Sequence, residues 1–349
     1  MAATAHELNE REQTILRYVV QDFIDTATPV GSRYISKRHE DSLGLSSASI
    51  RNVLSDLEVL GYVHHPHTSA GRMPTDLGYR FYLDRLIELA RMSADEEQAI
   101  RRTLDPTDDP ADVLKECSRL LGKISHQLCI VTAPELSSGV FEKLELVQVM
   151  PNRIMVIISI KSGLVRTIMM EATSEFPREK LEDLGRFLNE RLSGLTIKQI
   201  RETFAERVRD GATDDTGLIQ LFIDSVDKLF VTPTTGRYHV GGTEQLIEQP
   251  EFMNPRDFRS VIELINDQEI LVHVLRKHEA GPDEVKVTIG REHEDGKLEP
   301  YSVITARYSI GDVTGSIGVL GPKRMPYDRM IPLVDFVART VSDMFAPPK

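Results

Sequence analysis

Apolar residues recur with helical spacing from the start of the chain. Asn9, followed three residues later by Glu12, matches a capping-box variant that begins a helix. Pro29 biases Thr28 away from helical angles, so this first helix should end there. One apolar set falls on a single face at i, i+4 and i+8 spacing: Ile15, Leu16, Val19, Phe23 and Ile24.

Two further helices are expected before residue 62. Ser32 can cap a short second helix that runs to about residue 40 with Ile35 turned inward, and Gly44 marks the following turn. The third helix is expected over Ser46–Gly61, because glycine is well placed just past a helix end. At 100° per residue, its core face spans an arc of about 120°. That face contains Ile50, Val53, Leu54, Leu57 and Leu60.

The pattern then changes to strand, turn and strand. The stretch YVHHPH predicts a strand, TSAG a tight turn, and RMPT the returning strand. Pro74 restricts that strand to an edge position, since proline cannot donate to the ladder. Thr75 then caps a last helix with an apolar face, formed by Tyr79, Tyr82, Leu83, Leu86 and Ile87.

This order of elements is that of a winged helix-turn-helix, which inserts its third helix into the DNA major groove. Small side chains opposite the core face permit close approach, and Arg51 and Asn52 have the shapes that pair with guanine and adenine. The turn would be the wing, where Arg72 grips phosphate or enters the minor groove. The candidate DNA-binding residues are Arg33, Lys37, Ser47, Ala48, Ser49, Arg51, Asn52, Ser55, His67, Thr68, Ser69 and Arg72.

The alternative for each of these residues is structural. The outer face of the third helix could be an ordinary solvated face, and the turn a plain hairpin with an exposed arginine. Arg33 and Lys37 could touch phosphates that flank the groove, while Arg38 is equally placed to be a surface charge. His64 and His65 point to opposite faces of a strand, so they are not expected to converge on a metal ion.

The segment Pro29–Asp84 closely resembles the N-terminal domain of the HrcA family, the heat-inducible transcription repressors of bacteria. Four motifs occur in the order and spacing of that family: PVGSR, IRN, DLE-LGY and PHTSAGR-PTD-GYRFY, where a dash marks a position that is not part of the match. A further motif of the family, GSIGVLGPKRMPYDRM, lies at Gly315–Met330, so the resemblance spans the chain. The sequence departs from the family at Val53, often acidic there, and at Leu77, often lysine, which removes one possible phosphate contact.

Beyond residue 92 the chain alternates strand-like and helix-like stretches. Residues 105–113 are rich in acid and proline and predict a boundary, and residues 113–128 read as a helix. Three strand-like runs follow in EKLELVQV, RIMVIISI and LVRTIMMEA. Helical spacing then dominates until strands return at EVKVTIG and YSVITARYSI, ahead of a terminal helix. A sheet interrupted by about 100 mostly helical residues suggests one domain inserted into another.

The expected fold is therefore α+β. The family resemblance implies an N-terminal winged helix-turn-helix plus a GAF-like α/β domain with a mostly helical inserted dimerisation domain. The expected boundaries are 1–92 for the winged-helix domain, 93–112 for a connector, 113–175 with 284–349 for the discontinuous GAF-like domain, and 176–283 for the insertion.

Composition narrows the class of protein. The 349 residues are 40% apolar and 28% charged, as in an ordinary globular protein of two or three domains. The net charge of −12 argues against a chain coated generally by nucleic acid. Residues 1–92 carry 10 Lys and Arg against 12 Asp and Glu, so this part is less acidic than the rest.

The sequence also predicts the compartment. Cys117 and Cys129 are too few for a disulfide framework and are expected to be reduced core residues of a cytoplasmic protein. No apolar run approaches the ~20 residues of a membrane-spanning helix, and the N-terminus does not have the pattern of a secretory signal, so no membrane association is expected.

Other function classes have weaker support. The sequence contains no HExxH, G-x-S-x-G, Walker or Cys-x-x-Cys motif, so neither an enzyme nor a cofactor site is expected. A winged-helix regulator whose GAF-like domain senses a metabolite is the alternative, and a scaffold protein without DNA affinity is a third possibility.

The resemblance implies a specific activity. It implies a homodimer that binds an inverted-repeat operator in double-stranded DNA, upstream of the GroE and DnaK chaperone operons, and blocks transcription. It also implies that the GroE chaperonin keeps the repressor active and that unfolded clients titrate the chaperonin away during heat shock.

Overall fold

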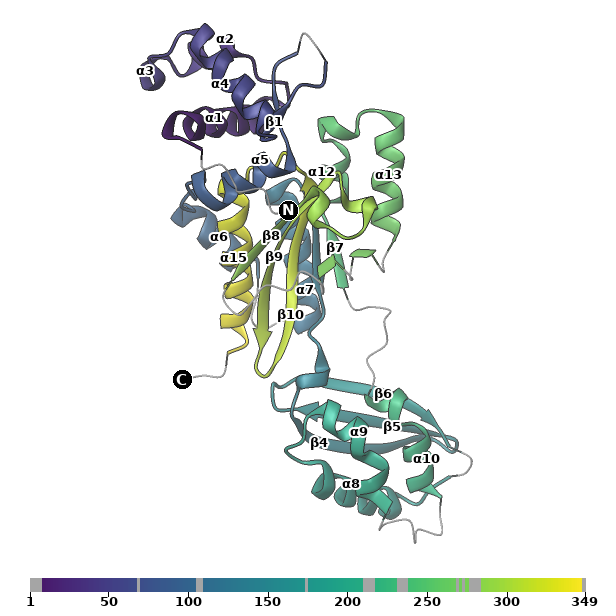
Figure 1. The fold of residues 1–349 in the computed structure, drawn as a ribbon. Coiled ribbons are helices and arrows are strands. Elements are labelled where there is room, and N and C mark those ends of the chain that lie inside the picture. The colour runs from purple at the N-terminus through teal and green to yellow at the C-terminus, as the bar shows by residue number, and fades with distance from the viewer. Residues whose placement is uncertain are drawn as a thin grey trace.

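The computed structural model describes residues 8–67, 70–104, 109–172, 175–209, 217–230, 238–267, 270–271, 274–275 and 284–346. Helices and sheets are both abundant, which confirms the expected α+β class. Figure 1 shows a helical N-terminal unit at one end, a five-stranded sheet in the middle, and a three-stranded sheet with its own helices at the other end.

The N-terminal unit follows the predicted order of elements with one addition: the second helix ends at Arg38, and a single helical turn, α3, precedes Gly44 where only a turn was expected. The capping box of Asn9 and Glu12 is present at the start of α1, and Thr75 accepts a hydrogen bond from Gly78 N–H to cap α5. Ser32 is the first residue of α2 rather than its cap, a position that Gly31 occupies. The elements are α1 (Glu10–Thr26), α2 (Ser32–Arg38), α3 (Glu40–Leu43), α4 (Ser47–Val59), β1 (Val63–His64), β2 (Met73–Pro74), α5 (Asp76–Phe81) and the π-helical turn η1 (Tyr82–Leu86).

The two strands of this unit are shorter than the sequence predicts. Val63 pairs with Pro74 and His64 with Met73, and the ladder stops there. Pro66 lacks the N–H group that would extend it toward the turn.

The middle unit is a sheet in which every neighbouring pair is antiparallel, with the order β7-β3-β10-β9-β8. Helix α15 packs on β9 and β10, and α7 packs on β3 and β7. The strands are β3 (Leu128–Thr132), β7 (Tyr238–Gly241), β8 (Val285–Ile289), β9 (Tyr301–Ile310) and β10 (Val313–Pro322). The helices are α6 (Ala94–Thr103), α7 (Pro110–Ser125), α12 (Thr243–Ile247), α13 (Pro255–Asn266) and α15 (Tyr327–Met344).

The expected connector at 93–112 is partly helical. Ser93 and Glu96 form a capping box at the start of α6, and Ile100 of this helix is buried. Short 3-10 turns complete the described structure at η2 (Leu136–Ser138), η4 (Pro250–Phe252), η5 (Gly290–Glu292) and η6 (Gly296–Leu298).

The third unit corrects one expectation about the sheets. The three strands after residue 140 do not join the C-terminal strands in one interrupted sheet; they form a separate sheet in the order β4-β5-β6. Tight turns link them, so each strand pairs with its neighbour in sequence. The elements are β4 (Phe141–Met150), β5 (Arg153–Ile160), β6 (Val165–Glu171), α8 (Arg178–Leu192), α9 (Ile197–Val208), α10 (Leu218–Asp224) and α11 (Val226–Phe230).

Both cysteines are buried as free thiols in α7 and β3, and burial raises the pKa of Cys117 to about 12. In the described part of the chain, no helix has the length and apolar composition needed to cross a bilayer.

Candidate nucleic-acid interface

Helix α4 has one buried face and one exposed face. Ser46 caps the helix by accepting a hydrogen bond from the N–H of Ser49 at 3.2 Å. The helix packs against α1 and α2. Its buried residues are Ile50, Val53, Leu54 and Leu57, which are four of the five predicted core positions; Leu60 is half-buried. The packing therefore fixes which side of α4 is available to a partner.

The exposed face carries small and hydrogen-bonding side chains. Ala48, Arg51, Asn52 and Ser55 are all exposed. The Ser55 hydroxyl donates to the carbonyl of Arg51 at 3.1 Å, so it adds little bulk to this face. Because Arg51 has no ion-pair partner among the described residues, its guanidinium can form new contacts.

Ser47 and Ser49 lie at the margin of this face and are half-buried. The hydroxyl of Ser47 lies 3.1 Å from that of Ser32 at the start of α2, and the Ser46 hydroxyl donates to that of Ser49 at 3.1 Å. Both hydroxyls thus take part in holding the start of α4.

Three cations of α2 differ in their surroundings. Arg33 and Lys37 are exposed and form no ion pair within the described ranges. Arg38 bonds to Asp22 at 3.0 Å and to Asp25 at 2.8 Å. Burial raises the pKa of Asp22, although its hydrogen bond with His39 and the charge of Arg38 act in the opposite direction. Arg38 is therefore engaged in joining α2 to α1, while Arg33 and Lys37 are available.

Arg72 lies at the base of the hairpin rather than at its tip. Its N–H and C=O each bond to Val30 at 2.8 Å, and its guanidinium lies 2.7 Å from the Glu58 carboxylate of α4. The Arg72 side chain is 21% exposed. The exposed basic turn that the sequence suggested is, at this residue, a paired and mostly covered arginine.

The neighbouring turn is held by close backbone contact. A Cβ at Gly71 would lie 2.5 Å from the carbonyl oxygen of Pro29, so only glycine fits beside that segment. His67 is exposed, and the predicted contacts Thr68 and Ser69 lie outside the described residues.

Glu58 is the residue of this site that the sequence reasoning missed. Burial raises its pKa, but hydrogen bonds from His65 and Arg72 and the charge of Arg72 outweigh that effect, and the net pKa is lowered. Glu58 follows Arg51 by seven residues, which places both on the same side of the helix. That spacing was the available signal for an acid beside the candidate contacts.

The chain is similar to a known family over most of its length. A family model described as "HrcA protein C terminal domain" matches residues 111–331. The chain is 41% identical to the heat-inducible transcription repressor HrcA of Chlorobium phaeobacteroides, with 97% of this chain and 98% of that protein covered. It is also 41% identical to the protein of the same name from Chlorobium chlorochromatii, with coverages of 96% and 97%.

A solved structure has a similar fold. It is titled as a hypothetical protein, shares 27% of its sequence with this chain, and superposes with a TM-score of 0.61 over 97% of this chain and 99% of its own.

Proposed function

This chain belongs to the HrcA family of heat-inducible transcription repressors, and on that premise we propose that it represses heat-shock genes by binding an inverted-repeat DNA operator as a homodimer. The observation that carries the proposal is the outward face of α4. It presents Ala48, Arg51 and Asn52 to solvent, with a short hairpin beside it.

In this proposal the N-terminal unit is a winged helix-turn-helix. Helix α4 enters the major groove, where small residues allow close approach and Arg51 and Asn52 bond to base edges. Arg33 and Lys37, which have no ion-pair partner among the described residues, contact phosphates on the flanking backbone. His67, Thr68, Ser69 and Arg72 belong to the wing, and Arg72 reaches phosphate by leaving Glu58.

The open face of the three-stranded sheet supports the dimer. Helices α8, α9 and α10 lie beside this sheet in Figure 1, and α8 packs against β4. Strand register places Val147, Met155 and Met169 in one row across the opposite face, where Val147 is 40% and Met169 41% exposed. A second copy would remove this apolar row from water. We therefore assign the three-stranded sheet and α8–α11 to the dimerisation domain, and the five-stranded sheet to the GAF-like domain.

Relief of repression is proposed to depend on the GroE chaperonin, as the family resemblance implies. Chaperonin keeps the repressor folded in the cytoplasm at ordinary temperature, and unfolded clients occupy it during heat shock. A marginally stable repressor suits this regulation, because a change of about 1–2 kcal/mol in the free energy of unfolding changes the active fraction several-fold.

The test is a gel shift on the inverted repeat of a chaperone promoter, with and without chaperonin. We expect saturable binding that weakens steeply with salt, is lost on a scrambled duplex, and increases when chaperonin is added after heating. Equal affinity for the operator and the scrambled duplex would contradict the proposal.

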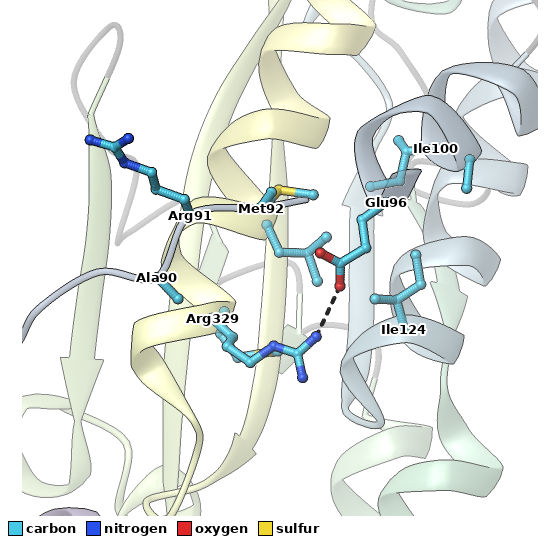
Figure 2. Close-up of a pocket in the computed structure, with 10 residues that line it drawn as sticks. Ala90, Arg91, Met92, Glu96, Ile100, Ile124 and Arg329 are labelled. Atoms are coloured by element: carbon cyan, nitrogen blue, oxygen red, sulfur yellow. Dashed lines mark hydrogen bonds and ion pairs between the residues drawn. The ribbon is translucent and has the colours of Figure 1, made fainter. Parts of the chain in front are cut away.

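A pocket favours a second candidate function, the sensing of a small molecule. About 330 Å³ lies between α6, α7 and α15, with apolar walls that include Met92, Ile100 and Ile124. Figure 2 shows the ion pair between Glu96 and Arg329 across this pocket, at 3.0 Å. Small-molecule sites have this size and composition. A saturable rise in Tm with one compound of a metabolite panel, lost in Ile100→Trp, would support sensing; no such rise would contradict it.

A further inference from the structure

Two segments 247 residues apart meet between the N-terminal unit and the five-stranded sheet. Asp76, the first residue of α5, accepts a hydrogen bond from Lys323 Nζ at 2.5 Å and another from the N–H of Arg291 at 3.0 Å. The Asp76 side chain is 23% and that of Lys323 27% exposed, so water screens this pair only in part.

The backbone facing Asp76 is shaped to receive it. Gly290 has φ +53°, and a Cβ at this position would lie 2.2 Å from a carboxylate oxygen of Asp76. Any larger residue would displace the carboxylate from the N–H of Arg291. This close fit makes Asp76 a specific contact between the units rather than a surface charge.

A second residue of α5, Arg80, makes a parallel contact. Arg80 donates from Nε to Glu292 at 2.7 Å and from Nη2 to the carbonyl of Val287 at 2.7 Å. Asp76 and Arg80 lie four residues apart, on the same side of α5. One face of this helix is thus fixed at two points along β8 and η5.

A third contact joins the segment that follows β10 to α1. Arg324 donates from Nη1 to the carbonyl of Ile24 at 2.7 Å, near the end of α1. It is held in place by Glu251, at 2.6 Å from its Nε. Because α1 packs against α4, Arg324 is one helix away from the candidate DNA-reading face.

We propose that Asp76, Arg80, Lys323 and Arg324 are positioning residues for DNA binding, which hold α4 of each copy at the separation and angle that an inverted repeat requires. This inference rests on the proposed function. Two reading helices joined in one dimer bind both half-sites at once only if their spacing matches that of the operator. Three polar contacts that involve both α1 and α5 add to the apolar packing between the units, where the ring of Tyr79 meets that of Tyr327. Together they restrain rotation of the N-terminal unit about the chain connection at residues 87–93.

The contacts define the expected phenotype. A dimer whose N-terminal units are loosely held would bind a single half-site with normal affinity. It would lose the additional affinity that comes from binding both half-sites at once. A residue that touched DNA would instead weaken binding to both kinds of duplex.

The experiment measures affinity for a full inverted repeat and for a single half-site. We expect Asp76→Lys and Lys323→Asp each to weaken binding to the full repeat about tenfold or more, with half-site binding changed less than about twofold. The double variant Asp76→Lys/Lys323→Asp should recover only the part of the loss that comes from this ion pair, because a lysine at position 76 cannot accept the hydrogen bond from the N–H of Arg291. Asp335→Asn is the matched control, since Asp335 pairs with Arg339 at 3.0 Å and is 29% exposed on α15.

A second readout separates positioning from stability. The spacing between the two half-sites of the operator is increased in steps of one base pair, and affinity is measured for each duplex. We expect the affinity of wild type to fall sharply with the added spacing and that of the single variants to fall only weakly. Thermal unfolding checks that each variant folds. If a single variant does not fold, the double variant Asp76→Lys/Lys323→Asp is used for this measurement instead.

The outcomes are distinguishable. Equal losses on half-site and full repeat, or no loss on either, would overturn the positioning role and leave the proposed function standing. If wild type binds neither duplex, the proposed function fails and this inference fails with it.

Discussion

The carboxylate of Glu58 on α4 lies 2.7 Å from the guanidinium of Arg72 at the base of the hairpin. Both residues belong to the candidate interface, and the pair joins the reading helix to the hairpin that follows it. An acid that covers an arginine has two effects here: it stabilises the local fold, and it removes one positive charge from the surface that would face DNA.

We expect Glu58→Gln to increase DNA affinity while it lowers stability. The change removes a negative charge and releases Arg72 toward phosphate, so the slope of log affinity against log salt should steepen by about one. The free energy of unfolding should fall by about 1 kcal/mol, typical of a single ion pair. Fluorescence anisotropy over a salt series and urea unfolding measure the two quantities.

The double variant Glu58→Gln/Arg72→Ala is the control for this release. It should lose the steeper salt slope, because the freed cation is absent. If the double variant keeps the full gain in affinity, Arg72 does not reach the backbone.

The stabilising effect of Glu58 should depend on pH in a defined direction. Its pKa is lowered in the folded protein from an ordinary value of 4.5, with burial opposing the hydrogen bonds of His65 and Arg72 and the charge of Arg72. A depressed carboxyl pKa contributes stability that is present above the unfolded value and is lost as pH falls through the folded value. The Tm difference between wild type and Glu58→Gln should shrink as the pH falls below about 4.5. A difference that grows on acidification would contradict this sign.

The exposed face of α4 makes a prediction about sequence specificity. Arg51→Ala should weaken operator binding by about 1–3 kcal/mol and relax preference at one base pair. Arg33→Ala should instead weaken binding to operator and random duplexes alike, and should reduce the salt slope by about one. Binding to a panel of single-base operator variants distinguishes the two effects. Wild-type specificity in Arg51→Ala would remove this residue from the base contacts.

The N-terminal elements were predictable because their signals are local. The capping box at Asn9 and Glu12, the cap at Thr75 and the glycine after α4 each act over three or four residues, and all three are present. The division of α4 into a core face and an open face follows from helical period alone, which is why Arg51 and Asn52 were placed correctly on the exposed side.

Pairing between distant segments was not predictable from those signals. Strand β3 pairs with β10 across more than 180 residues, whereas β4–β6 form a sheet of their own among the described strands. All of these strands nevertheless have similar apolar patterns. The partners of Arg72 and Asp76 were missed for the same reason, since nothing near Asp76 in the sequence indicates Lys323. The family motifs at Pro29–Asp84 and Gly315–Met330 identified the two segments that contain Asp76 and Lys323, but they did not show that these segments are in contact.

Gly71 should tolerate no side chain, because a Cβ would lie 2.5 Å from the backbone oxygen of Pro29. Gly71→Ala is expected to destabilise the N-terminal unit by about 1–3 kcal/mol, the usual cost of overpacking. Gly185→Ala, inside α8, is the control, since no heavy atom lies within 4 Å of a Cβ there. Chemical denaturation monitored by circular dichroism measures both, and equal effects would contradict the close contact at Gly71.

The apolar row on the three-stranded sheet makes the last prediction. Val147→Asp or Met169→Asp would place a charge in the centre of the proposed dimer contact, where burial of an unpaired carboxylate is strongly unfavourable. Each variant should weaken dimerisation by at least about 2 kcal/mol, as expected for a central interface residue. Sedimentation equilibrium measures the change, and Met253→Asp is the control, because Met253 is 79% exposed and lies outside this sheet. The monomeric variants should keep their affinity for a half-site and lose that for the full inverted repeat, as expected for Asp76→Lys and Lys323→Asp. Only the sheet variants should change the mass in solution. A Val147→Asp protein that remains a dimer would place the contact between copies elsewhere on the chain.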